Sequence, residues 1–282
     1  MGELVGFVYN AHIPRAAALV ESLVKSLGLE GRSWVCPVPD IETFSARFPD
    51  TRVVITAGGD GTILRTVRVA APFKVPILGV NLGRVGFMTE LGVEDAAERI
   101  PSYLDGSHRV EERMMIEAAV HRADGGASPT AHSLNDVVVA RGPTPHLLDI
   151  DATIDGVPLT TYRADGLVIC TPTGSTGYAL SAGGPIVHPE AREILLQPVA
   201  AHMSLNTGLL VPGTSIVDLV VKEPDGAVFS VDGVIGATLE PGDRVTVRSS
   251  PHTARFLRAG QPADFYTTLT RSLRFGGRPA PT

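Results

Sequence analysis

Hydrophobic residues in the first hundred positions form short continuous runs that alternate with segments of helical periodicity. Leu4–Tyr9 and Arg52–Ala57 are mostly apolar runs, as expected for strands that are covered on both faces. Between them, Pro14 begins a stretch with apolar residues at helical spacing up to Leu27, and Gly28 marks its end. Two further strands are predicted at Val35–Val38 and Val75–Val80. This alternation predicts a doubly wound α/β domain with a mainly parallel sheet.

The pattern changes at about residue 108. From there the apolar segments are short, β-rich and bounded by glycine, proline or aspartate, and helical periodicity is scarce. We therefore predict an α/β domain at residues 1–107 and a β-rich domain at 108–261, which makes a two-domain α+β protein overall. The tail at 262–282 has helical character and is expected to pack back on the first domain.

Composition narrows the functional classes. The 282 residues carry 24 Lys and Arg against 30 Asp and Glu, a net charge of -6, with no basic run. Nucleic-acid binding, which needs clustered cations, is therefore not expected. No apolar stretch reaches the ~20 residues that span a bilayer, and the N-terminus lacks the basic start of a signal peptide. Cys36 and Cys170 form no CxxC pair, as in reducing compartments. We expect a cytoplasmic protein that binds neither nucleic acid nor membranes.

A glycine-rich sequence directly follows the strand at 52–57. Gly58, Gly59, Asp60, Gly61 and Thr62 lie before a predicted helix, where open α/β sheets bind ligands. Glycines let the backbone approach phosphates, and a helix N-terminus favours anions. An acid in such a loop is unfavourable for simple anion binding, but it suits a substrate hydroxyl or a Mg²⁺ ion. The alternative is a tight turn that needs glycines for structural reasons alone.

Other nucleotide and metal motifs are absent from the sequence. It contains no GxxxxGK[ST], no GxGxxG and no HExxH, and its eight histidines show no metal-ligand spacing. A phosphate loop of the Walker type, a Rossmann dinucleotide site and a protein-built metal cluster are therefore not expected.

A long uncharged segment, TPTGSTGYALSAGGP at Thr171–Pro185, follows the apolar run Gly166–Cys170. Six of its fifteen residues are Ser, Thr or Tyr and four are Gly, which suits a segment that surrounds a polar ligand. Arg163 and Asp165 lie just before the same strand, where an arginine can neutralise a phosphate and an aspartate can accept hydrogen bonds from a ribose. The alternative is a surface loop, although ordinary loops rarely run this long without charge.

Two other positions carry weaker signals. Asn135 and Asp136 open the run VVVARG, and such a pair is common at the start of a strand. His146 follows GPTP, where a histidine is more often a surface or capping residue than a ligand. Taken alone, each of these positions favours a structural explanation.

Together these segments resemble the NAD kinase family. The similarity rests on GGDGT at 58–62, NLGRVGFMTE at 81–90, the Asn-acid pair at 135–136, and TPTGSTGYALSAGGP with the preceding YRADG. AHMSLN at 201–206 and VDG at 231–233 fall where the family has similar stretches. GGDGT alone is only moderately specific, because diacylglycerol and sphingosine kinases and phosphofructokinases carry related loops. The long TPTGST-type segment therefore decides the resemblance, which covers nearly the whole chain.

The resemblance implies a fold and a reaction. An α/β domain precedes a β-rich domain, with the active site between them. The family transfers the γ-phosphoryl group of ATP, or in some members of inorganic polyphosphate, to the adenosine-ribose 2′-OH of NAD with Mg²⁺. Members are homodimers or homotetramers. We therefore expect a kinase that binds NAD and ATP, uses a divalent metal and forms a homo-oligomer.

The resemblance also implies roles for individual residues. Asp60, with Gly61 beside it, matches the proton acceptor, and Arg65 matches a nucleotide contact. The expected NAD contacts are Asn135, Asp136, His146, Arg163 and Asp165, and the segment that closes round the ligand is Thr176, Gly177, Tyr178, Ala179, Leu180 and Ser181.

Two positions depart from the family pattern. The pair is usually Asn-Glu, and Asp136 is one methylene shorter, so a direct contact becomes water-mediated. Gln often follows VDG, whereas Val234 stands here and puts a nicotinamide or ribose contact in doubt. Two other functions stay open: a lipid kinase that shares GGDGT, for which no basic amphipathic helix is present, and a silent NAD-binding sensor, against which the intact GGDGT argues.

Overall fold

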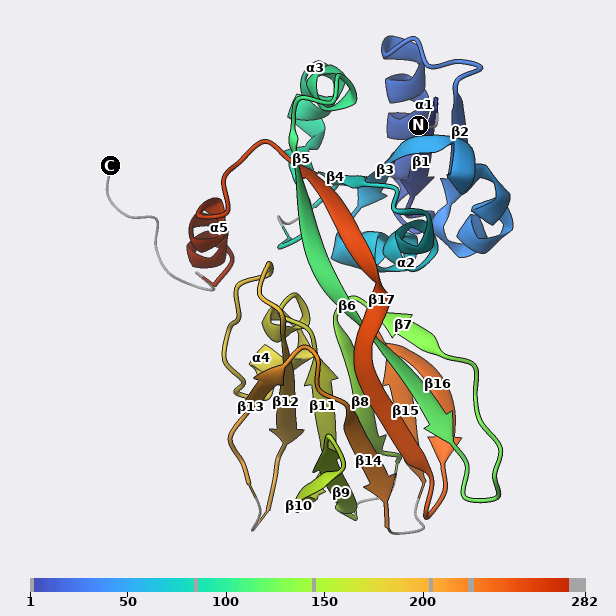
Figure 1. Ribbon diagram of the computed structural model, residues 1–282. Coiled ribbons are helices and arrows are strands. Elements are labelled where there is room, and N and C mark those ends of the chain that lie inside the picture. Colours follow the sequence, from blue (N-terminus) through green and yellow to red (C-terminus); the bar gives the residue numbers. More distant parts are fainter. Residues whose placement is uncertain (1–2, 84–85, 144–145, 203–204, 223–225, 274–282) are drawn as a thin grey trace. The chain divides into compact units, whose positions relative to one another are not determined.

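The structure is a computed structural model that describes residues 3–83, 86–143, 146–202, 205–222 and 226–273. By its internal contacts the chain divides into two compact units, Met1–Glu112 with Ala254–Thr282, and Arg113–Thr253. Figure 1 labels the helices and strands of each unit. Across the described ranges, no helix is both long and apolar enough to cross a membrane.

The first unit is built on a parallel sheet with the order β4-β3-β1-β2, and β5 lies beside β4. Its strands are β1 (Leu4–Tyr9), β2 (Ser33–Pro37), β3 (Thr51–Gly58), β4 (Ile77–Asn81) and β5 (Leu91–Gly92). Its helices are α1 (Pro14–Ser26), α2 (Asp60–Ala70), α3 (Val93–Leu104) and α5 (Asp264–Leu273), and its 3-10 segments are η1 (Val38–Asp50) and η2 (Ala71–Phe73). The predicted α/β fold is confirmed.

Helices pack on both faces of this sheet because successive strand residues point to opposite sides. Leu78 and Val80 of β4 belong to the same core as Val20 of α1 and Ile100 of α3. The residue between these two strand positions, Gly79, faces α2, where a Cβ would lie 2.8 Å from Ile63 Cδ1. The sheet is therefore covered by α1 and α3 on one face and by α2 on the other.

The limits of α1 follow from two residues with special backbone properties. Pro14 occupies the first turn, where its missing N–H costs nothing. Gly28 follows the helix at φ 61, a left-handed backbone that glycine adopts without strain. The sequence predicted both ends of this helix correctly to within a residue or two.

The second unit contains a six-stranded antiparallel sheet with the order β13-β12-β11-β8-β15-β16. A second antiparallel group joins β10, β9, β14 and β17, with β6 and β7 beside it. The strand bounds are β6 (Arg109–His121), β7 (Ala131–Ser133), β8 (Asp136–Arg141), β9 (Leu148–Ile154), β10 (Val157–Ala164), β11 (Gly166–Cys170), β12 (Glu193–Val199), β13 (Leu209–Pro212), β14 (Val217–Val221), β15 (Ala227–Val231), β16 (Val234–Leu239) and β17 (Arg244–Arg258). The predicted β-rich half is confirmed.

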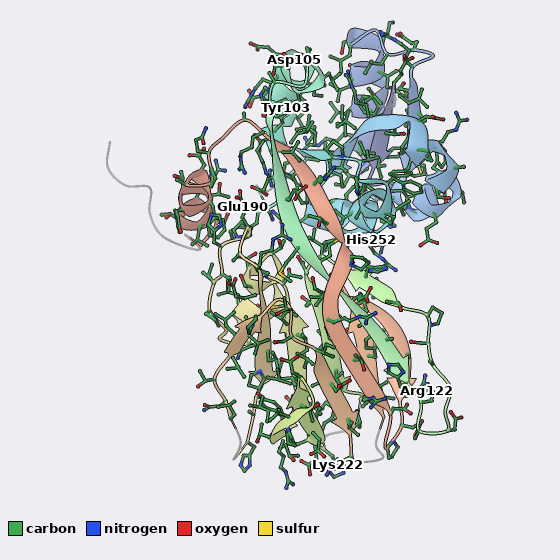
Figure 2. The ribbon with its side chains drawn as sticks, viewed as in Figure 1. Tyr103, Asp105, Arg122, Glu190, Lys222 and His252 are labelled. Atoms are coloured by element: carbon green, nitrogen blue, oxygen red, sulfur yellow. The ribbon has the colours of Figure 1, made fainter. Side chains whose placement is uncertain are left out.

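One hydrophobic core holds the two sheets of the second unit together. Ile150 of β9 and Val247 of β17 pack in the same cluster as Val139 of β8 and Leu196 of β12. At the edge of this unit, Arg122 (labelled in Figure 2) ties the turn after β6 to the turn before β17, because its Nη1 lies 2.6 Å from Asp243 Oδ2. The unit is therefore a two-layer β structure with its own core.

Three elements differ from the sequence prediction. η1 and α3 were not predicted, and both contain prolines that interrupt the apolar periodicity. The segment Thr171–Pro185, predicted as a loop, contains the 3-10 turn η3 (Gly174–Thr176) and the short helix α4 (Tyr178–Ser181). Its first residues are buried, so this segment is part of the folded unit rather than a surface loop.

Candidate active site

Asp60 lies at the carboxyl edge of the parallel sheet of the first unit. β3 ends at Gly58 and α2 begins at Asp60, so the side chain stands beside the unpaired N–H groups of a helix start. The N–H of Phe87 donates to Asp60 Oδ2 at 3.0 Å, and the N–H of Met88 donates to Oδ1 at 3.2 Å. Both oxygens are therefore oriented by the backbone, and each keeps a lone pair for a ligand.

Gly86 comes so close to Asp60 that no side chain fits there. A Cβ on Gly86 would lie 2.2 Å from Asp60 Oδ1. Gly86 belongs to NLGRVGFMTE, the segment at 81–90 that the sequence linked to a family without a stated role; residues 84–85 lie outside the described part. The described end of this segment has a local role, because it supports the Asp60 carboxylate from one side.

The other residues of GGDGT have different surroundings. A Cβ on Gly58 would lie 2.2 Å from Thr62 Oγ1, so this glycine is required by packing. By contrast, a Cβ on Gly59 or Gly61 would meet nothing within 4 Å, so these two glycines border open space. Arg65 is exposed one turn further along α2. The turn therefore combines one glycine needed for the fold with two that leave the backbone open to a ligand.

In the second unit, Asn135 and Asp136 form a turn that is anchored by Asp232. Asp232 Oδ1 accepts hydrogen bonds from Ser133 Oγ at 2.5 Å and from the N–H groups of Asn135 and Asp136 at 2.8 and 3.2 Å. Its Oδ2 accepts the N–H of Leu134 at 3.1 Å. Asp232 itself has a left-handed backbone, with φ 47. One carboxylate thus determines the shape of the whole turn.

Asp136 is buried in this turn, and its pKa is raised to about 7. Burial is the larger cause, because it disfavours the charged form, and the nearby negative charge of Asp232 adds to it. The Asp232 carboxylate is compensated by its four hydrogen bonds. With a pKa of about 7, Asp136 can therefore take up or release a proton near neutral pH.

The segment that follows β11 packs directly on the same turn. The N–H of Thr171 donates to the Asn135 carbonyl oxygen at 2.9 Å. A Cβ on Gly174 would lie 2.1 Å from that oxygen, so no side chain is possible there. A Cβ on Gly177 would lie 3.8 Å from both Asn135 Nδ2 and Asp136 Oδ2. The structure therefore brings the predicted residues Asn135, Asp136 and Gly177 into one cluster.

The other residues of the segment 176–181, which is predicted to close round the ligand, differ in how exposed they are to solvent. Ala179 is buried, Thr176 and Leu180 are half-buried, and Tyr178 and Ser181 are exposed. The ligand contacts predicted for Thr176, Gly177, Tyr178, Ala179, Leu180 and Ser181 stay a prediction.

The remaining predicted residues lie on other parts of the second unit. Asp165 follows β10 and forms an ion pair with Arg141, with Oδ1 2.6 Å from Nε. Arg163 is exposed on β10, and its carbonyl oxygen accepts the N–H of His202 at 2.8 Å. His146 is exposed before β9. The sequence had not indicated that Asp165 forms an ion pair with Arg141.

Comparison with known sequences shows the family of this chain. Sequence models of the ATP-NAD kinase N-terminal domain and the ATP-NAD kinase C-terminal domain match residues 5–108 and 134–259. An NAD kinase of Dehalococcoides mccartyi is 37% identical over 277 residues, with 97% of each chain covered. The chain belongs to the ATP-NAD kinase family. An NAD kinase of Heliobacterium modesticaldum is also 37% identical, over 96% of this chain and 99% of its own.

Solved structures agree with the family. A crystal structure of yeast NADH kinase complexed with NADH has a TM-score of 0.87 and covers 100% of this chain and 90% of its own; at 24% identity it supports the fold. An NAD kinase from Archaeoglobus fulgidus in complex with ATP has a TM-score of 0.73 and 25% identity, over 96% and 98%. The chain is thus a phosphotransferase of the NAD kinase type, and the lipid-kinase and sensor alternatives are not favoured.

Proposed function

We propose that this chain transfers the γ-phosphoryl group of ATP to the adenosine-ribose 2′-OH of NAD, with Asp60 as the proton acceptor. The observation that carries the proposal is the carboxylate of Asp60, which two backbone N–H groups orient beside a glycine-rich turn. A general base must be held within hydrogen-bond reach of the proton that it takes. Asp60 keeps one lone pair on each oxygen for a substrate hydroxyl.

The proposed reaction depends on alignment and charge neutralisation more than on covalent chemistry. The ribose oxygen forms a bond to the γ-phosphorus while the bond from that phosphorus to the β–γ bridging oxygen breaks. The hydroxyl proton passes to Asp60. Gly59 and Gly61 border open space, so donor phosphates can approach the backbone there, next to the N-terminus of α2.

A divalent metal ion can be held at this site by the phosphates of the phosphoryl donor. Within the described residues no group of three or more His, Cys, Asp or Glu could hold a metal ion. Mg²⁺ usually keeps several waters and is bound largely through substrate phosphates, so the donor phosphates are suitable ligands and Asp60 can act as the base. When bound, Mg²⁺ would neutralise charge on the transferring phosphoryl group.

We assign the NAD contacts to the cluster of the second unit. Asn135 has a buried Oδ1 without a hydrogen-bond partner in the described structure, and Asp136 carries a raised pKa beside it. A buried polar atom without a partner is costly, and a ligand that donates to it removes the cost. Arg163 is exposed and Asp165, which pairs with Arg141, is half-exposed, so the polar parts of a nucleotide can reach both side chains.

The test is a coupled assay of the product. Purified protein receives NAD, ATP and Mg²⁺, and a dehydrogenase that accepts NADP but not NAD detects the product. We expect NADP to form and to disappear when EDTA removes the metal. A parallel reaction with inorganic polyphosphate in place of ATP tests the second donor. If neither donor gives NADP while NAD still binds in calorimetry, the proposed reaction is wrong.

We also propose a homo-oligomer, a dimer or a tetramer, in the cytoplasm. The edge strand β16 exposes Val234 and Ile235, which are 44% and 74% exposed, and large apolar side chains on a sheet edge suit an interface between copies. Both cysteines are free and buried, as in a reducing compartment. Sedimentation equilibrium tests the assembly, and the mass of a single chain would contradict it.

A further inference from the structure

A cavity of about 480 Å³ opens at the amino edge of the parallel sheet of the first unit. It lies at the start of β3 and just before β4, whereas Asp60 follows the opposite end of β3. The two strand starts are held together, because the N–H of Val54 donates to the Pro76 carbonyl oxygen at 2.9 Å. Every described residue that lines the cavity belongs to the first unit, and none of them was indicated by the sequence.

The wall of this cavity offers apolar side chains that remain open to solvent. The ring of Phe48 is buried and stacks on the ring of Phe73, with 5.7 Å between centroids and 26° between planes. Phe73 is nevertheless 41% exposed, and Val110 of β6 is 46% exposed. Exposed apolar surface inside a cavity of this kind favours an apolar ligand group, and an aromatic ring can pack on the exposed part of Phe73.

Cationic side chains lie beside this apolar wall. Arg52 is half-buried at the start of β3, and Lys74 is exposed just before β4. Neither side chain forms a hydrogen bond or an ion pair with any residue that the structure describes. Because β3 and β4 are neighbours in the sheet, the two cations lie on adjacent segments. By contrast, Arg255 is already paired with Glu112 at 2.9 Å.

The cavity is also lined by an acid, Asp105, at the end of α3, where Figure 2 labels Tyr103 and Asp105. The N–H of Ser107 donates to Asp105 Oδ1 at 2.8 Å, and hydrogen bonds from Ser107 lower the pKa of this carboxyl group. Asp105 is thus held as a carboxylate by its own turn, on a different segment from Arg52 and Lys74. Two cations against this one acid leave the cavity with a single net positive charge.

We propose that this cavity is a second ligand site, which binds a small molecule with an apolar ring and one carboxylate group. The ring packs against Phe73 and Val110, and the carboxylate pairs with Arg52 and Lys74. A single net positive charge suits a monoanion better than a phosphate dianion. Sites for small molecules usually measure about 300–1,000 Å³ and are mostly apolar with few polar groups, and a cavity of 480 Å³ falls within this range.

The experiment compares two probes that share one skeleton and differ in charge, cinnamate and the neutral cinnamyl alcohol. Each probe is titrated in a calorimeter into the full chain with saturating NAD and ADP, so that the nucleotide sites are filled. We expect cinnamate to bind about 10-fold more tightly than the alcohol, the size of a charge-assisted hydrogen bond. Arg52→Gln should remove most of this preference, and Lys74→Gln should weaken cinnamate by only about 2- to 5-fold, because solvent screens an exposed cation.

Phe73→Ala tests the apolar wall separately. It should weaken both probes by about the same factor and leave the preference for cinnamate unchanged, because it removes apolar surface and no charge. Lys25→Gln is the matched control for Lys74→Gln, since Lys25 is an exposed lysine of the same unit that does not line the cavity. This control should bind both probes as the unchanged protein does.

Four results would overturn the inference. They are no binding of either probe, which would leave this face to another kind of partner; equal affinity of the unchanged protein for both probes; equal losses in Lys25→Gln and Lys74→Gln, which would assign the attraction to overall charge; and unchanged affinities in Phe73→Ala. The titrations do not depend on NADP formation, so a failure of the proposed reaction would leave this second site standing.

Discussion

Asp136 shows how the site depends on the environment of single residues. Its carboxyl group is buried next to Asp232, and the pKa near 7 means that its proton is retained well above the usual range of an aspartate. Three N–H groups and a hydroxyl donate hydrogen bonds to the neighbouring Asp232 carboxylate. The turn that presents Asn135 therefore contains one acid held by four hydrogen bonds and a second acid whose burial favours its protonated form.

Replacing Asp136 with asparagine should change how stability depends on pH. The folded pKa lies above the unfolded value of 3.8, so the folded state binds the proton more tightly and loses stability as pH rises from about 4 through 7. An asparagine side chain cannot ionise, so Asp136→Asn should be more stable than the unchanged protein at pH 8, by up to about 4 kcal/mol at ~1.4 kcal/mol for each pKa unit. The difference should vanish towards pH 4. Urea unfolding at several pH values measures it.

Asp50→Asn serves as the control, because Asp50 is an exposed acid in the other unit. Its unfolding free energy should follow that of the unchanged protein at every pH. Parallel curves for Asp136→Asn and the unchanged protein would show that Asp136 is an ordinary ionised carboxylate.

At the scale of elements, the segment Thr171–Pro185 after β11 packs tightly against the turn at Asn135. The contact is made by backbone atoms, since Thr171 N–H donates to the Asn135 carbonyl and Gly174 leaves no room for a Cβ beside it. This contact puts Gly177 next to the side chains of Asn135 and Asp136. Any shift of the segment therefore moves the proposed NAD contacts.

Gly174→Ala should weaken NAD binding through this contact. The added methyl group would sit 2.1 Å from the Asn135 oxygen, so the turn must move, and overpacking of this kind costs roughly 1–3 kcal/mol of stability. Calorimetry with NAD and urea unfolding measure the two effects. Gly92→Ala is a matched control, because the nearest atom to its Cβ is the flexible end of Glu94 at 3.3 Å. Equal NAD affinity in both variants would contradict the coupling.

The sequence predicted the regular elements where periodicity is uninterrupted. The run at 52–57 became β3, Thr51–Gly58, and the helical spacing from Pro14 became α1, Pro14–Ser26. It did not predict η1 or α3, because Pro49 and Pro101 inside them disturb the helical pattern. α4 is too short for any periodicity, and it forms because tertiary packing buries the residues around it.

At the scale of the whole molecule, the parts of the site that the sequence did not indicate are contacts between distant segments. Asp60 is held by N–H groups 27 and 28 residues away, and Asp232 anchors a turn 96 to 99 residues away. The sequence pattern around each residue does not predict these long-range hydrogen bonds, because they form only when distant strands pair in the folded chain. The motifs GGDGT and VDG contain Asp60 and Asp232, but the hydrogen-bond partners of these two acids could be identified only from the structure. The predicted domain boundaries, 107/108 and 261/262, stay a prediction.

The first unit is completed by residues from the far end of the sequence. Arg258, whose side chain is 9% exposed, forms ion pairs with Glu90 at 3.0 Å and Glu111 at 3.4 Å. Arg258→Leu should lower the free energy of unfolding by about 3–5 kcal/mol, because it leaves buried acids without this partner. Urea unfolding measures this loss. Arg255→Leu, which removes the exposed pair with Glu112, should cost about 0–1 kcal/mol. Equal losses would contradict the buried role of Arg258.

The central claim is that Asp60 accepts the proton of the ribose hydroxyl. The most direct measurement is kcat for NADP formation by Asp60→Asn at saturating NAD and ATP, with Asp40→Asn, an exposed acid of the same unit, as the control. We predict a fall of about 10²–10⁴ in kcat, the usual contribution of a positioned base, while calorimetry shows unchanged NAD affinity and Asp40→Asn turns over normally. Near-normal turnover by Asp60→Asn would contradict the claim and require another proton acceptor.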